Sequence, residues 1–170
     1  MSLVLPMVSG SWHEHPWQAP EKGGLLRRLL QAGNFLRSVR GQLRFGELSR
    51  APLQLIRFHM EGDTVECDWL ARRPDSWDKY VSRRQQLRHS TLQTLADAIR
   101  VRALVFSAIP GAESAYFRVY REVADRAPEL IVTGCAQRND NLARGVHSLV
   151  MRAKVLGFQF HLEGDALCRI

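Results

Sequence analysis

The sequence predicts an α+β fold, with an antiparallel sheet built from β-hairpins and helices packed on one face of that sheet. Two observations predict this class. The predicted strands come in adjacent pairs joined by short turns, and stretches with helical spacing of apolar residues separate these pairs. Strands that alternated singly with helices would instead indicate a parallel sheet. The expected order is helix, hairpin, long helix, hairpin, helix and hairpin.

The 170 residues divide into three predicted parts. Residues 1–23 are rich in proline and glycine and show no sustained period, so we expect a flexible N-terminal arm. Residues 24–49 form a basic helical segment. Residues 50–170 form the α+β domain, which is long enough to bury a core without disulfides.

The basic segment is predicted to be an amphipathic helix. Its apolar positions follow a 4-3-4-3-4 spacing that places them on one face: Leu25, Leu29, Ala32, Leu36, Val39 and Leu43. Gly33 and Gly41 each cost about 1 kcal/mol relative to alanine, so the helix could break at either one.

The first hairpin is predicted over residues 53–72. Residues 53–61 and 64–72 alternate in polarity around Gly62-Asp63, which is typical of a tight turn. A two-residue turn pairs Met60 with Val65. The buried face then comprises six residues: Ile56, Phe58, Met60, Val65, Cys67 and Trp69. The opposite face pairs opposite charges, His59 with Glu66 and Arg57 with Asp68.

In the rest of the chain the spacing of apolar residues is less regular. A long helix begins at residue 77 or 83 and ends near 108, with Leu92, Leu95, Ala96, Ile99, Ala103 and Phe106 as its apolar stripe. Residues 115–123 fit a helix or a strand, and the strand is preferred because 130–136 reads as its partner. A helix over 142–156 is capped by Asn139-Asp140-Asn141 and ended by Gly157. A last hairpin repeats the Glu-Gly-Asp turn of the first at an offset of 102 residues, through convergence or duplication.

Charge gives the main functional indication. The chain has 24 basic and 17 acidic residues, for a net charge of +7, and only three of the basic residues are lysines. Five arginines are the predicted anion-binding or nucleic-acid-binding residues: Arg27, Arg28, Arg37, Arg40 and Arg44. The first hypothesis is therefore a non-enzymatic binding protein with an anionic partner, nucleic acid before other polyanions. A solvated basic face, a membrane-surface helix and a protein partner on the Leu25 to Leu43 face remain alternatives.

Signatures of catalysis, metal binding or cofactor binding are weak or absent in the sequence. It contains no GxxxxGK[ST] or GxGxxG phosphate loop and no GxSxG nucleophile turn. The three cysteines are widely spaced and form no metal-binding pair. From these observations together, no catalytic residue, metal site or cofactor is predicted. The alternative function is a small enzyme or ligand-binding domain with a pocket between sheet and helices. Its only hint is a set of carboxylates near two tryptophans: Asp68, Asp75 and Asp78 with Trp69 and Trp77.

The expected location is the cytoplasm. No run of about 18 apolar residues is present, as a spanning helix would require. Near the N-terminus the apolar run is short and interrupted by Pro6, unlike the core of a signal peptide.

Overall fold

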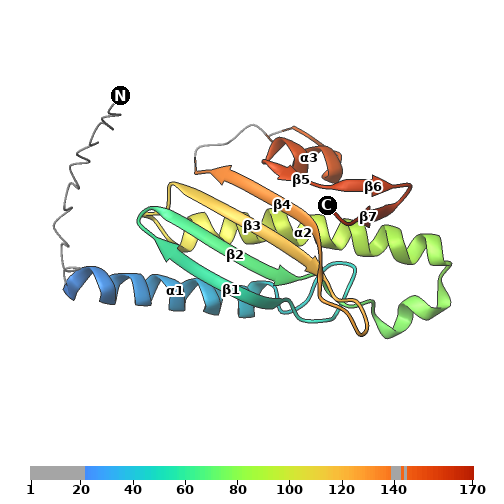
Figure 1. The fold of residues 1–170 in the computed structure, drawn as a ribbon, viewed down its shortest axis with the longest axis horizontal. Coiled ribbons are helices and arrows are strands. Elements are labelled where there is room, and N and C mark those ends of the chain that lie inside the picture. Colours follow the sequence, from blue (N-terminus) through green and yellow to red (C-terminus); the bar gives the residue numbers. More distant parts are fainter. Residues whose placement is uncertain (1–21, 139–142, 144) are drawn as a thin grey trace, which may run out of the picture.

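A computed structural model describes residues 22–138, 143 and 145–170 (Figure 1). The predicted Asn139-Asp140-Asn141 cap lies outside the described residues, and so does the predicted arm except for its last two residues. The helices are α1 (Lys22–Gln42), α2 (Arg83–Ala108) and α3 (Leu149–Val155), with a short 3₁₀ helix at Ser76–Tyr80. The strands are β1 (Gln54–Glu61), β2 (Thr64–Leu70), β3 (Ser114–Arg121), β4 (Glu129–Gln137), β5 (Phe158–Gln159), β6 (His161–Glu163) and β7 (Ala166–Cys168).

The main sheet has five strands in the order β1-β2-β3-β4-β5, and α1 and α2 lie against the same face (Figure 1). The α+β class and the hairpins β1–β2 and β3–β4 are confirmed. The two hairpins meet through a parallel pair, β2 with β3, so the sheet is mixed and not wholly antiparallel. The long helix α2 explains this pairing, because it carries the chain back along the sheet before β3 begins.

The first hairpin has the predicted register. Met60 pairs with Val65, Phe58 with Cys67 and His59 with Glu66. One detail is wrong: Ile56 is 53% exposed instead of buried. A β-bulge between Leu55 and Arg57 shifts the register, so Leu55 takes the place opposite Trp69.

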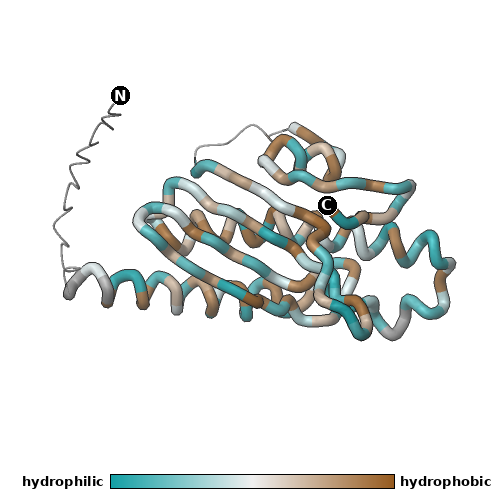
Figure 2. Tube along the Cα trace, in the orientation of Figure 1, coloured by the Kyte–Doolittle hydropathy of each residue, from teal (hydrophilic) through white to brown (hydrophobic). Residues whose placement is uncertain are grey.

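Helix α1 runs unbroken through Gly33 and Gly41. The residues it buries are Phe35, Val39 and Leu43, and the Phe35 ring stacks on Phe58 of β1 with centroids 4.7 Å apart. Of the stripe members whose side chains the structure describes, Val39 and Leu43 are buried and Ala32 is half-buried. Leu29 and Leu36 are exposed, because the core is reached by residues four apart rather than by the alternating 4-3 pattern. Apolar residues occur along the whole helix in Figure 2, and its early turns expose Leu26, Leu29 and Leu30.

Helix α2 begins at the second of the two predicted positions. Ser82 caps it through a capping box with Gln85. Its buried face differs from the predicted stripe: Ala103 is exposed, whereas the polar Thr94 and Asp97 point inward. These buried polar residues interrupt the apolar period and account for the error.

The C-terminal elements agree with the predicted types but not with every boundary. Strands β3 and β4 confirm the second hairpin. Helix α3 is shorter than predicted and is capped by Ser148; Gly157, with φ 89°, follows its end. The last hairpin forms a separate two-stranded sheet, and Gly62 and Gly164 have φ values of 58° and 60° in the two matching turns.

Candidate functional site

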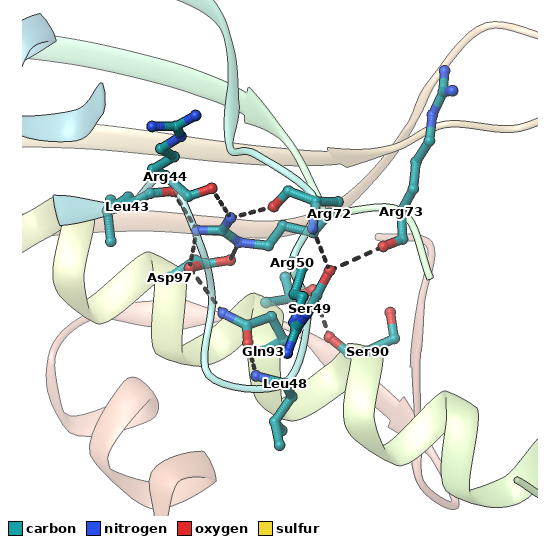
Figure 3. Close-up of polar contacts among 12 residues, drawn as sticks. Leu43, Arg44, Leu48, Ser49, Arg50, Arg72, Arg73, Ser90, Gln93 and Asp97 are labelled. Atoms are coloured by element: carbon teal, nitrogen blue, oxygen red, sulfur yellow. Dashed lines mark hydrogen bonds and ion pairs between the residues drawn. The ribbon is translucent and has the colours of Figure 1, made fainter. Parts of the chain in front are cut away.

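The five predicted arginines fall into two groups. Arg37 and Arg40 lie on α1, and Arg44 lies two residues past its end; these three, here called the outer arginine row, are all exposed. Figure 3 shows the Arg44 side chain pointing away from the interior contacts beside it. Arg27 and Arg28 are exposed one to two turns from the start of α1, where they line a separate cavity of about 210 Å³ near the Gly62 turn.

Few contacts within the protein engage the outer arginine row. Arg37 donates to Asn34 Oδ1 at 3.1 Å, and the Arg44 guanidinium lies 5.3 Å from the centre of the Phe45 ring. Phe45 is itself 56% exposed. Among the described residues, no carboxylate forms an ion pair with any of the five predicted arginines.

Elsewhere in the described chain, eight ion pairs join arginines to acidic residues. The arginine of each pair is given first: Arg57–Glu66, Arg72–Asp97, Arg73–Glu122, Arg84–Asp165, Arg100–Glu47, Arg118–Glu66, Arg118–Asp68 and Arg121–Glu129. Glu47 is the single acid between residues 22 and 50, and its partner is on α2. From Lys22 to Arg44 the chain has six basic and no acidic residues, which is most of its net charge of +7. The excess charge is therefore concentrated on α1.

A buried polar cluster fixes the end of α1 that carries the row (Figure 3). The Arg72 guanidinium pairs with Asp97 at 2.7 and 3.1 Å, and it also donates to the carbonyls of Leu43 at 2.8 Å and of Ala51. Gln93 donates to Asp97 and accepts from the Leu48 amide at 2.6 Å. A cation facing the last carbonyls of a helix is favourable, so Arg72 holds α1 and the following loop onto α2.

A larger cavity of about 740 Å³ lies beside this cluster, and Arg72 is part of its lining. It is bounded by the segments that follow β2 and β3, by the first half of α2 and by β7. None of its residues was predicted as a site. Gln86, Ser90 and Thr94 recur every four residues on α2, and this polar spacing within a helix is the signal that could have identified one wall.

The carboxylates proposed as an enzyme hint do not form a shared centre. Asp68 lies on the outer face of the sheet and accepts from Arg118 at 2.9 Å, whereas Asp75 accepts from the Arg50 amide at 3.0 Å. Asp78 accepts from the Asp75 amide and lies 3.9 Å from His89. No group of three or more metal-ligating side chains gathers among the described residues.

The thiols and carboxylates differ in their ionisation. Burial raises the pKa of the Cys67 thiol, whereas Cys135 is exposed. Hydrogen bonds from Arg73 and Arg84 lower the pKa values of Glu122 and Asp165. These groups lie outside the outer arginine row.

Comparisons with protein-family models, curated proteins and solved structures find no match to this chain. Of the helices that the structure describes, none is long and apolar enough to cross a bilayer.

Proposed function

We propose that the chain is a cytoplasmic, non-enzymatic binding protein whose outer arginine row contacts an anionic polymer, with nucleic acid as the partner. The observation that supports this proposal most is the pairing pattern. Eight ion pairs join arginines to acids elsewhere in the described chain, and none involves Arg37, Arg40 or Arg44. Guanidinium groups without acidic partners keep their charge and donors available for phosphate oxygens.

The spacing of the row suits a phosphate backbone. Arg37 and Arg40 are three residues apart on α1, about 4.5 Å along a helix that rises 1.5 Å per residue, and Arg44 follows two residues after the helix ends. One DNA strand carries a phosphate about every 3.4 Å along the duplex axis, so the spacing of Arg37 and Arg40 is close to that of neighbouring phosphates. The exposed Phe45 ring next to Arg44 offers a surface on which a base can stack.

Two other partners remain as outcomes of the test. Leu26, Leu29 and Leu30 are exposed on the early turns of α1, as on a helix that binds an anionic membrane surface. The same leucines could contact a protein. Nucleic acid is favoured because the row lies in the second half of α1 and just past its end, whereas these leucines occupy the first half.

The test replaces the three arginines of the row together with glutamine and measures binding to labelled single- and double-stranded oligonucleotides by fluorescence anisotropy. The matched control replaces three exposed arginines remote from α1, Arg83, Arg88 and Arg126, so that both variants lose the same charge. Point variants are preferred to a truncation at residue 50, because deleting α1 would remove Phe35, Val39 and Leu43 from the core.

We expect the row variant to lose at least about tenfold in affinity, corresponding to roughly 1.4 kcal/mol, and the control to lose much less. Equal losses in both variants would mean that only net charge matters. Binding to anionic vesicles without binding to any oligonucleotide would replace the proposal with the membrane-surface alternative.

A further inference from the structure

The 740 Å³ cavity lies within the size range of small-molecule sites, which is roughly 300–1,000 Å³. It is open beside the carboxyl ends of β2 and β3, two neighbouring parallel strands. Five of its residues are buried: Arg72, and the four residues here called the deep wall, Thr91, Thr94, Ile131 and Leu167. The turn after β3 forms its exposed rim, with Ala124 and Asp125.

The arginines of this cavity are already occupied by other contacts. Arg72 is held by Asp97 and backbone carbonyls. Arg73 donates to both carboxylate oxygens of Glu122, at 2.7 and 2.8 Å. Arg121 donates to Glu129 at 2.7 Å and to the Leu167 carbonyl at 3.0 Å. The charges of Arg73 and Arg121 are already balanced by Glu122 and Glu129, and Asp125 adds a negative charge at the rim, so the cavity does not favour an anionic ligand.

The hydroxyl protons of Thr91 and Thr94 in the deep wall already form hydrogen bonds within the protein. Thr91 Oγ1 donates to the Asp165 carbonyl at 2.9 Å and accepts from the Leu167 amide at 3.2 Å. Thr94 Oγ1 donates to the Ser90 carbonyl at 2.8 Å. A hydroxyl has one proton and two lone pairs, so both threonines can now offer only an acceptor to a ligand.

Apolar side chains make up much of the lining as a whole: Ala71, Pro74, Leu87, Val123, Ile131 and Leu167. We propose that this cavity binds an uncharged, mainly apolar small molecule that carries one O–H or N–H group. The apolar part of the ligand packs between α2 and the ends of the sheet strands. Its donor group bonds to Thr94 Oγ1. This site is separate from the outer arginine row and does not depend on the proposed function.

The test uses three probes of nearly equal shape: 2-naphthol, 2-methoxynaphthalene and 2-naphthoate. The first is neutral with a donor at the working pH, the second is neutral without one, and the third is an anion. Binding to the full chain is followed by ligand-observed NMR and probe fluorescence. We expect 2-naphthol to bind about 2- to 10-fold more tightly than 2-methoxynaphthalene, the range for one net hydrogen bond. We expect 2-naphthoate to bind most weakly.

Two variants locate the probe. Ala124→Trp narrows the cavity mouth, and Ala127→Trp places the same side chain on the same exposed turn but outside the lining. We expect the first to weaken 2-naphthol at least about tenfold and the second to leave it unchanged. Thr94→Val keeps the side-chain shape without the hydroxyl, so it should abolish the preference for 2-naphthol over 2-methoxynaphthalene while both still bind.

Three results would overturn the proposal. They are equal or tighter binding of 2-naphthoate, identical effects of the two tryptophan variants, and no saturable 2-naphthol binding at about 1 mM, which corresponds to roughly −4 kcal/mol. Oligonucleotide binding by Ala124→Trp is measured alongside. Ala124 is not part of the outer arginine row, so Ala124→Trp should leave oligonucleotide binding unchanged whether or not 2-naphthol binds. Failure of the cavity proposal therefore shows only in the naphthol data, and failure of the proposed function shows only in the oligonucleotide data.

Discussion

Replacing Asp97 with asparagine tests how the end of α1 is held in place. The Arg72 and Asp97 side chains are each only 1% exposed, and their two hydrogen bonds measure 2.7 and 3.1 Å. Asp97→Asn leaves the Arg72 guanidinium buried without a counter-ion. It also points the N–H₂ group of the new amide at an N–H group of Arg72, so two donors face each other. Removing one partner of a buried pair costs about 3–5 kcal/mol. For a chain of this length, that loss lowers Tm by roughly 6–20 °C, taking about 2–4 °C per kcal/mol.

The loss is measured by urea unfolding and by thermal unfolding followed with circular dichroism. The control is Glu122→Gln, which breaks an exposed bidentate pair with Arg73 and should change stability little. A double variant, Arg72→Met with Asp97→Leu, removes both charges and should be more stable than Asp97→Asn alone. If Asp97→Asn loses less than about 1 kcal/mol, or no more than Glu122→Gln, the assigned role of the buried pair is wrong.

Three smaller predictions concern a turn, a thiol and a carboxylate. Gly157→Ala should destabilise by more than about 1–2 kcal/mol, the cost of a left-handed residue, because φ is 89° and a Cβ would lie 2.2 Å from the Cys135 carbonyl oxygen; urea unfolding measures this. At mildly alkaline pH, a thiol reagent should label the exposed Cys135 and spare Cys67, whose thiol pKa is raised by burial; mass spectrometry of native protein checks both sites. Arg84→Gln should raise the pKa of Asp165 toward its ordinary value, measured by NMR titration. Because the native pKa is lowered, the associated stability is present above the unfolded-state pKa and disappears as pH falls through the native pKa.

Local pattern predicted part of this fold well. The alternation of residues 53–72 around Gly62-Asp63 specifies a register, since a one-residue slip would expose every buried side chain. The same pattern does not show the bulge that exposes Ile56, because a bulge adds one residue without changing the amino-acid types around it. The parallel pairing of β2 with β3 depends on where α2 returns the chain, which adjacent residues do not encode.

The candidate sites depend on contacts between distant residues. The sequence indicated the basic character of α1, and the structure adds that the row is separate from Arg27 and Arg28. It could not indicate that Arg72 would pair internally, since that contact joins residues 25 apart on different elements. The 740 Å³ cavity was expected only as a pocket between sheet and helices, and its residues come from α2, β4, β7 and two loops.

The salt dependence of nucleic-acid binding tests the central claim most directly. Association constants for a short DNA duplex are measured between about 50 and 200 mM salt for the wild type, the row variant and the matched control. Each phosphate contact contributes about 0.9 to the slope of log K against log salt, so three contacts make roughly a 40-fold affinity loss across this range. We predict that substituting Arg37, Arg40 and Arg44 lowers the magnitude of that slope by about 2–3, and that the control lowers it by less than about 1. An unchanged slope in the row variant would contradict the claim that this row contacts the phosphate backbone.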